Sequence, residues 1–346
     1  MSGGVDSSFA AAALMSQGWE VIGVHFRLWN QSQDRSPKDR IFAAEPSLQK
    51  TAQQLGIQLR IIDQSDRFRR EIVDYFVKEY LQGRTPNPCA LCNPKIKFAA
   101  LVKLADELKA SHISTGHYAR VDFDGCQSEC RLLEAADKSK DQSYFLFLLE
   151  QETLRRLILP LGNMTKSEVK KRIKELGLEA ANTEESQDVC FALSKDYAAV
   201  IESLEPSAQK SGDMVDLAGK KIGRHQGIYR YTIGQHRGLA LSRPDLFVVG
   251  IDAKKNQVVV DNESFLFHRR MTVSGLNWLS AVELPISCQA KIRYRFEKAA
   301  CTVEKASQGV LVVFDQPQRA ITPGQAAVFY RRERVLGGGW IEKAFD

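Results

Sequence analysis

The sequence predicts an α/β domain with a parallel sheet, followed by a region built almost entirely of β-strands. Three observations lead to this fold class. A glycine-rich stretch opens the chain directly before a helical segment. Strand-like and helix-like segments then alternate over roughly the first 200 residues, and after residue 212 short apolar runs are separated by Gly, Asn and Asp. The change of character follows Glu205-Pro206-Ser207, where we expect the first domain to end.

Hydrophobic periodicity predicts the individual elements. In the first domain we expect strands at residues 20–26, 58–62 and 112–115, and helices at residues 7–15, 47–55, 68–80 and 97–108. This alternation predicts parallel strands with helices on both faces and ligands at the carboxyl ends of the strands. A capping box of Thr165 and Glu168 opens a helix at 169–176, which with a helix at 196–204 forms a small helical appendix. In the second region we expect strands at 246–251, 257–260, 289–294 and 310–314.

Composition limits the class of protein. No apolar run reaches the roughly 18 residues of a membrane span, and the polar, glycine-rich start does not read as a signal peptide. We therefore expect a cytoplasmic protein without a membrane partner. The net charge of +6 and the pI of about 8.8 suit a polyanionic partner.

Cysteine usage adds to this picture. The seven cysteines are an odd number, which argues against a disulfide framework. Cys288 and Cys301 lie in strand-like runs and are expected to be small core residues. The spacing of Cys126 and Cys130 is weak support for a metal site.

The hexapeptide SGGVDS, Ser2 to Ser7, is the first motif with chemical meaning. Its two glycines allow close approach to a phosphate and turn geometries that other residues avoid. The helix that follows directs unpaired N–H groups at an anion, serine hydroxyls add donors, and Asp6 could hold Mg²⁺ through water. No Gly-Lys-Ser/Thr follows, so this is not a Walker loop. Such a pocket suits a departing pyrophosphate, and hence transfer of AMP; the alternative is an ordinary glycine turn.

The second motif is Thr85-Pro86-Asn87-Pro88-Cys89-Ala90-Leu91-Cys92-Asn93. The two prolines fix the backbone around Asn87 and present its side chain from a rigid loop. Cys92 precedes a basic helix entrance that contains Lys95 and Lys97, and these features are expected to lower its pKa. A structural turn with a buried thiol is the alternative.

The third motif is Ser186-Gln187-Asp188-Val189-Cys190-Phe191. Paired with Cys92, Cys190 suggests two cysteines that meet over one site. Together with Cys89, these thiols could instead hold an iron–sulfur cluster or zinc, with a histidine or an external group as the fourth ligand.

Several polar stretches predict a nucleic-acid surface. Gly116 follows an expected strand and would allow close approach to a nucleotide, and His117 could contact a base or phosphate. The polar run 140–143 is expected to be exposed and free to bind. Residues 229–238 and 291–296 interleave aromatics with cations, which would place Arg or Lys on one face of a strand.

At this point the chain resembles the tRNA-specific 2-thiouridylases, a family of PP-loop ATPases. The motifs that carry the resemblance are SGGVDS, GRTPNPC-x2-CN, TGHYAR, KDQSYFL, SQDVCF, YTIGQHRGL and TPGQAAVFY, in the family's order and from Ser2 to Trp340. The resemblance implies an adenine-nucleotide α-hydrolase-like domain, a small central β domain and a C-terminal β-barrel that binds tRNA. We place these at residues 1–204, 205–270 and 271–346.

The resemblance also implies roles for individual residues. Cys190 would carry a persulfide and Cys92 would be its catalytic partner. The ATP-binding residues would be Ser2, Gly3, Gly4, Val5, Asp6, Ser7, Phe26 and Gly116. The residues facing the target base would be Asn87, Pro88 and Cys89. The residues contacting tRNA would be His117, Lys140, Asp141, Gln142, Arg293, Tyr294 and Gln325.

The implied activity is that of a tRNA-uridine 2-sulfurtransferase. It uses ATP and Mg²⁺ to convert the wobble uridine of Lys, Glu and Gln type tRNAs to 2-thiouridine, and it takes sulfur from a cysteine desulfurase or a sulfur relay protein. Position 89 is Cys here, where some members have Asp, which keeps the cluster alternative open. The strand expected before the loop is absent from the sequence or lies upstream of it. Two other functions also remain open: an ATP-pyrophosphatase that amidates a carbonyl substrate, and a non-catalytic tRNA-binding module.

Overall fold

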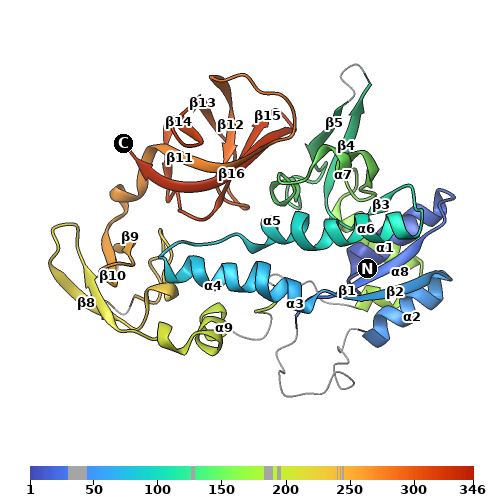
Figure 1. Ribbon diagram of the computed structural model, residues 1–346, viewed down its shortest axis with the longest axis horizontal. Helices are drawn as coiled ribbons and strands as arrows, with labels where there is room; N and C mark the ends of the chain where they lie inside the picture. Colours follow the sequence, from blue (N-terminus) through green and yellow to red (C-terminus); the bar gives the residue numbers. More distant parts are fainter. Residues whose placement is uncertain are drawn as a thin grey trace. The chain divides into compact units, whose positions relative to one another are not determined.

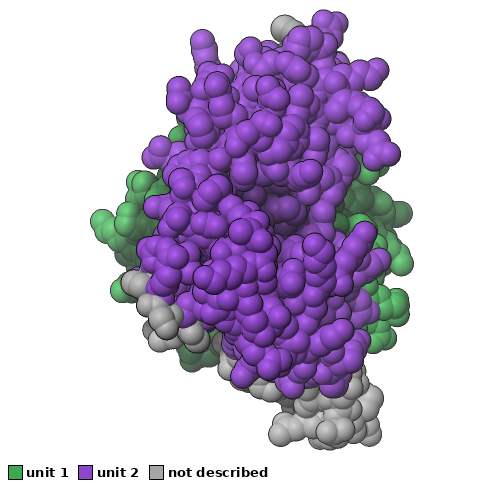
Figure 2. Space-filling model, turned by 90° about the vertical axis from the view of Figure 1, so that its left-hand side faces the viewer, with its two compact units in different colours: residues 1–72, 89–191, 333–335 green, residues 73–88, 192–332, 336–346 purple. Residues whose placement is uncertain are grey.

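In the computed structural model the chain divides into two compact units, which are described separately and coloured in Figure 2. Unit 1 comprises Met1–Ile72, Cys89–Phe191 and Glu333–Val335, and unit 2 comprises Val73–Pro88, Ala192–Arg332 and Leu336–Asp346. The structure describes residues 1–29, 45–125, 129–182, 190–192, 196–239, 241, 243 and 245–346. None of the helices in these ranges is long and apolar enough to cross a membrane.

Unit 1 contains parallel strand pairs and the helices that accompany them. Its elements are α1 (Val5–Ser16), β1 (Ile22–Arg27), α2 (Glu45–Leu55), β2 (Gln58–Asp63), α3 (Ser65–Phe68), α5 (Pro88–Cys92), the π-helical η2 (Asn93–Phe98), α6 (Ala99–Glu107), β3 (Ile113–Ser114), β4 (Ala119–Asp124), β5 (Glu129–Glu134), α7 (Gln151–Arg156), β6 (Leu157–Ile158) and α8 (Lys166–Glu175). Short 3-10 turns occur at Ser143–Phe145 and Glu179–Asn182. The α/β prediction is confirmed, because β1 pairs with β2 and β3 with β6, both in parallel (Figure 1).

Two details differ from the prediction. The parallel strands described in unit 1 form two separate pairs rather than one sheet, and β4 and β5 pair with each other in antiparallel. The helix expected at 68–80 is divided into α3, a π-helical turn η1 (Arg69–Val73) and α4 (Asp74–Leu81). Periodicity does not distinguish a π-helical turn from an α-helical one, because both bury a similar face.

The core of unit 1 forms where α1 packs on α8. Phe9 and Ala10 of α1 are buried together with Val169 and Ile173 of α8. The predicted capping box at the start of α8 is present, since the Thr165 side chain accepts from the Glu168 N–H and the Glu168 carboxylate accepts from the Thr165 N–H. This cap fixes where α8 begins and therefore where its first residue lies.

Unit 2 is predominantly β, as predicted. Its helices are α4 and α9 (Tyr197–Leu204), with 3-10 turns at Pro206–Ala208, Ile228–Arg230 and Glu263–Leu266. A central sheet has the order β8-β7-β10-β9, from β7 (Gly212–Val215), β8 (Lys221–His225), β9 (Leu246–Asp252) and β10 (Gln257–Asn262). The remaining strands are β11 (Phe267–Trp278), β12 (Ile286–Lys291), β13 (Ala299–Lys305), β14 (Val310–Arg319), β15 (Ala326–Arg331) and β16 (Arg334–Phe345).

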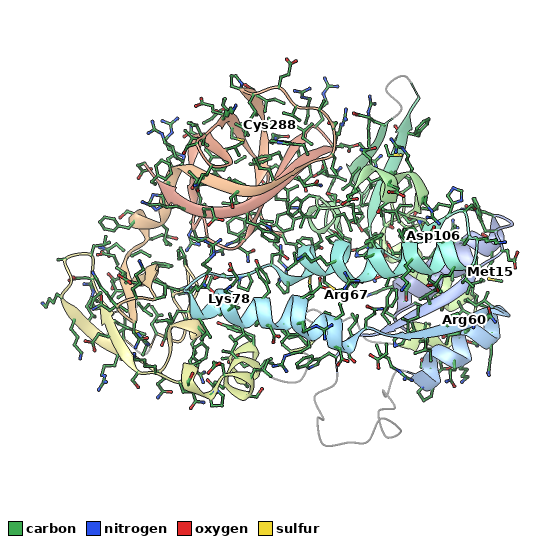
Figure 3. The ribbon with its side chains drawn as sticks, viewed as in Figure 1. Met15, Arg60, Arg67, Lys78, Asp106 and Cys288 are labelled. Atoms are coloured by element: carbon green, nitrogen blue, oxygen red, sulfur yellow. The ribbon has the colours of Figure 1, made fainter. Side chains whose placement is uncertain are left out.

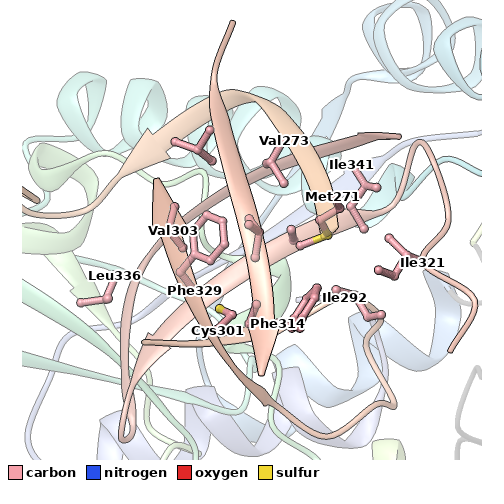
Figure 4. Close-up of a cluster of buried hydrophobic side chains, with 14 residues drawn as sticks. Met271, Val273, Ile292, Cys301, Val303, Phe314, Ile321, Phe329, Leu336 and Ile341 are labelled. Atoms are coloured by element: carbon pink, nitrogen blue, oxygen red, sulfur yellow. The ribbon is translucent and has the colours of Figure 1, made fainter. Parts of the chain in front are cut away.

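These last six strands close into a barrel in the order β11-β14-β13-β12-β15-β16, because β16 also pairs with β11. Alternate residues of each strand fill the interior (Figure 4), among them Val303, Phe314 and Phe329. Closure leaves no exposed sheet edge in the barrel itself. The predicted C-terminal barrel is therefore confirmed.

Two stretches predicted as basic strands are not strands. Residues 292–296 follow β12 and form a turn in which the Phe296 N–H donates to the Arg293 carbonyl. Residues 228–238 form a 3-10 turn and further turns, with positive φ at Gly234 and Gly238. Alternation of aromatic and basic residues did not predict these segments correctly, because glycines and local turn hydrogen bonds determine the backbone conformation here.

Candidate active site

The phosphate loop of unit 1 is organised by its own serines. The Ser2 N–H donates to Ser7 Oγ at 2.9 Å, the two hydroxyls lie 3.1 Å apart, and Ser7 Oγ donates to the Gly4 carbonyl at 3.2 Å. Gly4 is the N-cap of α1 and no side chain caps the helix. The first N–H groups of α1 have no partner within the helix and can therefore serve an anion.

Only one of the two loop glycines needs an unusual backbone conformation. Gly3 has φ of +81°, in the left-handed region, whereas Gly4 has an ordinary φ of −86°. A Cβ added at Gly4 would meet only Ser2 Oγ, at 3.6 Å. The expectation that both glycines adopt conformations closed to other residues is therefore wrong for Gly4.

Asp6 is held by two donors from distant parts of the chain. Lys166 Nζ lies 2.6 and 2.7 Å from its two carboxylate oxygens, and the Tyr118 hydroxyl donates to one of them at 2.8 Å. Lys166 is the first residue of α8 and its residue surface is only 7% exposed. Asp6 is 31% exposed at its side chain and also lines the cavity beside the loop, so its role in holding Mg²⁺ through water stays a prediction.

A cavity of about 680 Å³ adjoins this loop, a volume within the range of small-molecule sites. Its walls come from the loop, from β1 and β3, and from α6. The predicted nucleotide residues among its lining are Ser2, Asp6, Ser7, Phe26 and Gly116. Gly3 and Gly4 do not line it, and the Val5 side chain packs in the core instead. That ATP occupies the cavity stays a prediction.

Gly116 makes a close approach, although to the protein itself. A Cβ at this position would lie 2.8 Å from the backbone carbon of Asp6 and 2.8 Å from the nitrogen of Ser7. The glycine therefore lets the end of β3 pack directly against the phosphate loop. The close approach of Gly116 to a nucleotide stays a prediction.

The three thiols of the predicted site are grouped in unit 1. Cys89 and Cys92 lie on α5. Cys92 is buried, whereas the Cys89 and Cys190 side chains are exposed to solvent, although both have many protein atoms around them. Their charges interact with one another, and Lys97 acts on all three. The prediction that Cys92 and Cys190 meet over one site is supported by this grouping; the residues 186–189 before Cys190 lie outside the described ranges.

The expectation of a lowered thiol pKa is wrong. Burial raises the pKa of Cys92 to about 12 and that of Cys190 to about 11, while the Lys97 ammonium lowers both by a smaller amount. Cys92 is also not at a helix N-terminus, because α5 continues directly into η2. Desolvation of the thiolate therefore outweighs the nearby positive charge.

His117 belongs to the same environment. Its Nδ1 lies 2.8 Å from Thr115 Oγ1 and its ring stacks on Phe98 with centroids 6.0 Å apart. Burial, helped by Lys97, lowers the pKa of His117 to about 3. The imidazole is thus neutral at physiological pH and can offer a hydrogen bond, but not the positive charge that a phosphate contact would favour.

The polar run 140–143 is not an exposed binding strip. Asp141 is 3% exposed and accepts hydrogen bonds from the Ala135 N–H and from the N–H and hydroxyl of Ser143. Gln142 Oε1 accepts from the Tyr118 N–H. These side chains organise the chain around the phosphate loop, so exposure of Asp141 was wrongly expected; Lys140 is half-buried.

The predicted residues of unit 2 also have internal partners. Arg293 donates to the Ile233 carbonyl at 2.8 Å and to Thr322 Oγ1 at 2.5 Å. Gln325 donates to the carbonyls of Thr85 and Pro86, at 2.9 and 3.1 Å. The backbone of the loop at Thr85 and Pro86 is therefore bonded to the barrel within this unit.

Asn87 is only 6% exposed, so its side chain is not presented from the loop as predicted. The ring of Tyr294, a predicted tRNA contact, has a cation beside it, because Lys291 Nζ lies 5.7 Å from the ring centre.

Comparison with known proteins identifies the chain. The family model described as tRNA methyl transferase HUP domain matches residues 1–194, the tRNA methyl transferase PRC-barrel domain matches 203–262, and the aminomethyltransferase beta-barrel domain matches 268–341. A tRNA-specific 2-thiouridylase MnmA of Syntrophotalea carbinolica is 44% identical over 99% of this chain and 97% of its own length. One of Geobacter metallireducens is 42% identical over 99% and 96%. The chain belongs to the tRNA-specific 2-thiouridylase family.

Two lysines of this thiouridylase-family site have contacts that the sequence did not predict. Lys166 directly follows Thr165 of the predicted capping box, and Lys97 was expected only as part of a basic helix entrance. In the structure Lys166 binds Asp6 of the phosphate loop, while Lys97 lines the cavity and acts on the three thiols. No spacing signal could reveal either, because their partners lie far away in the sequence.

The metal alternatives can be tested against geometry. Within the described ranges no group of three or more His, Cys, Asp or Glu side chains is arranged to hold a metal ion. Cys126 lies outside these ranges, and Cys130 is buried with its backbone bonded to Gln151. A second hollow of about 470 Å³ in unit 2, lined in part by Tyr197, Arg230 and Tyr231, includes no cysteine.

Proposed function

We propose that this chain catalyses the ATP-dependent 2-thiolation of the wobble uridine of tRNA, giving 2-thiouridine, AMP and pyrophosphate. The observation that carries the proposal is the position of Lys97. This lysine lines the cavity beside the phosphate loop, and its charge acts on Cys89, Cys92 and Cys190. A nucleotide cavity next to a group of thiols is what a reaction needs that first activates a carbonyl with ATP and then delivers sulfur to it.

The activation step makes the uracil C2 oxygen a good leaving group. That oxygen attacks the ATP α-phosphorus, an O-adenylate forms, and pyrophosphate departs. The N–H groups at the start of α1 and the Ser2 hydroxyl offer hydrogen bonds to the departing phosphates, and the Ser7 hydroxyl can do so if it leaves the Gly4 carbonyl. Mg²⁺ bound to ATP would neutralise phosphate charge, and Asp6, which lines the cavity and is paired with Lys166, is the side chain proposed to hold it through water.

The sulfur step uses the two cysteines in turn. A persulfide on Cys190 attacks C2 through its terminal sulfur and displaces AMP. The Cys92 thiolate then attacks the Cys190 sulfur, which breaks the sulfur–sulfur bond, leaves the terminal sulfur on C2, and forms a Cys92–Cys190 disulfide. A two-electron thiol reductant restores both cysteines. Burial raises the pKa of Cys92 and so disfavours its thiolate, whereas the charge of Lys97 favours ionisation.

The partners follow from this chemistry. The net charge of +6 favours tRNA, and the proposed substrates are tRNAs of the Lys, Glu and Gln type. The persulfide is proposed to come from a cysteine desulfurase or a sulfur relay protein in the cytoplasm. Asn87, Pro88 and Cys89 are proposed to face the target base, and the tRNA-contact residues named from the sequence, as well as the domain limits 1–204, 205–270 and 271–346, remain proposals.

Two variants decide between the persulfide route and its rivals. The purified chain is incubated with unmodified tRNA, ATP, Mg²⁺ and a persulfide donor, and 2-thiouridine is measured by mass spectrometry of nucleosides. We expect Cys92→Ser and Cys190→Ser each to abolish 2-thiouridine, with the persulfide on Cys190 still detectable in Cys92→Ser. Cys130→Ser, a buried thiol whose charged neighbours are Arg155 and Asp122, is the matched control and should stay active.

The rival functions give different results in the same assay. Loss of activity in Cys89→Ala, together with a brown chromophore in anaerobically purified protein, would replace the persulfide by a cluster held by Cys89, Cys92 and Cys190. Retained ATP use in Cys190→Ser on a carbonyl substrate would favour amidation. Absence of tRNA-dependent ATP–pyrophosphate exchange would leave only a tRNA-binding module.

A further inference from the structure

The C-terminal barrel contains a second pair of thiols. Cys288 on β12 and Cys301 on β13 are direct partners in the antiparallel register, and their sulfur atoms lie 3.8 Å apart. Residues directly opposite in an antiparallel pair share one face and have Cα atoms about 4.5–5.5 Å apart, which falls inside the roughly 4.4–6.8 Å found for disulfides. A bond between these sulfurs therefore needs side-chain rotation and no rearrangement of the strands.

The two thiols are not equivalent in exposure. Cys301 is 3% exposed and belongs to the buried core of the barrel with Val303 and Phe314, as Figure 4 shows. Cys288 is half-buried and packs against that core from its rim (Figure 3). A small reagent from solvent thus meets Cys288 first. The expectation that both are core residues is confirmed for Cys301, whereas Cys288 packs against the core and is only partly buried.

The two thiols also differ in acidity, because their contact shifts their pKa values in opposite directions. Either sulfur can donate in this contact; the arrangement in which Cys301 donates lowers the pKa of Cys288, and the Arg331 guanidinium lowers it further. The same bond, together with burial, raises the pKa of Cys301. Cys288 is therefore the thiol that ionises, while Cys301 keeps its proton and lies in contact with it.

We propose that Cys288 and Cys301 form a redox-active dithiol, separate from Cys92 and Cys190, which hydroperoxides oxidise to a disulfide across β12 and β13. The Cys288 thiolate attacks a peroxide oxygen, the O–O bond breaks, and an alcohol or water leaves with the transfer of one proton. This makes a sulfenic acid on Cys288. The Cys301 sulfur then attacks the Cys288 sulfur, water leaves, and the disulfide forms. Two thiols are oxidised and one peroxide is reduced; a dithiol reductant reverses the bond.

Closure of this disulfide has a local consequence. It encloses residues 289–300, the segment that contains Arg293 and the turn after β12. Arg293 connects this turn to the Ile233 carbonyl and to Thr322. The disulfide would limit the motion of the turn that carries Arg293 and its hydrogen bonds. This consequence holds whether or not the chain thiolates tRNA, so the inference is independent of the proposed function.

The test uses hydrogen peroxide on the full chain. Protein is oxidised, unreacted thiols are blocked by alkylation, and peptides are mapped by mass spectrometry without reduction. We expect a peptide pair joined through Cys288 and Cys301 that has lost two hydrogens and that disappears after dithiothreitol. In Cys301→Ser, dimedone should trap a sulfenic acid on Cys288. In Cys288→Ser, Cys301 should stay reduced.

The control and the overturning results are equally specific. Cys130→Ser removes another buried thiol and should leave the joined peptide unchanged. Circular dichroism confirms that each variant is folded. The proposal is overturned if Cys288 and Cys301 remain separately alkylated after oxidation, or if Cys288 joins a different cysteine. It is also overturned if Cys288→Ser leaves Cys301 as readily oxidised as before.

Discussion

Lys166 Nζ lies within hydrogen-bond distance of both carboxylate oxygens of Asp6, at 2.6 and 2.7 Å. This contact ties the first turn of α1 to the first residue of α8, and Tyr118 completes it from a third segment. The phosphate loop is therefore positioned by side chains that converge from three separate parts of unit 1.

Replacement of Lys166 should weaken this arrangement. Lys166→Met removes a charged partner of Asp6, whose side chain is 31% exposed, and we expect a loss of roughly 2 kcal/mol in the free energy of unfolding. The affinity for ATP should fall as well, because the loop loses its support. Urea unfolding and calorimetric titration with ATP measure the two effects. Lys171→Met, on the exposed side of the same helix, is the control, and equal effects of the two variants would contradict the prediction.

The two loop glycines should respond differently to the same substitution. Gly3→Ala forces an L side chain into a left-handed conformation and should cost about 1 kcal/mol or more. Gly4→Ala meets no strain and has space beside Ser2, so we expect near wild-type stability and nucleotide affinity. Thermal unfolding and ATP titration of both variants check this contrast. A more severe effect at Gly4 would mean that its position is limited by the bound phosphate instead.

Lys97 should control the reactivity of the thiols. Because Lys97 lowers the pKa values of Cys92 and Cys190 against the effect of burial, Lys97→Met should raise both further. At any pH below about 11, the thiolate fraction and the rate of iodoacetamide alkylation should then fall for Cys190. In the unchanged protein the rate should rise with pH up to that value. Lys95→Met, an exposed neighbour, should have no such effect, and unchanged alkylation in Lys97→Met would refute the assignment.

His117 should not titrate near neutral pH. Burial and Lys97 hold its pKa at about 3, so the imidazole is neutral through the range from pH 5 to 8. NMR of the ring proton across this range should show a flat chemical shift for His117. An inflection for His117 between pH 5 and 7 would show that the ring is better solvated than described.

The sequence was sufficient for what depends on local pattern. The parallel pair β1–β2, the capping box at Thr165 and the grouping of Cys92 with Cys190 all follow from periodicity or from family motifs. What it could not provide depends on burial and on distant partners. Desolvation reversed the expected shift of the Cys92 pKa, and a hydrogen-bond network placed Asp141 inside the protein. The pairing of Lys166 with Asp6 has no local signal at all.

If ATP binds in the cavity as proposed, the position of Lys97 beside both the cavity and the thiols would impose an order of events. When ATP fills the cavity, its phosphates compete for the charge of Lys97, and the thiols lose part of the field that helps them to ionise. Once pyrophosphate leaves, the charge of Lys97 again lowers the pKa values of Cys92 and Cys190. The persulfide would then be most nucleophilic only after the base has been activated. Its sulfur would therefore not be lost to other reactions before that step. Slower alkylation of Cys190 in the presence of a non-hydrolysable ATP analogue, and recovery on its removal, would reveal this timing.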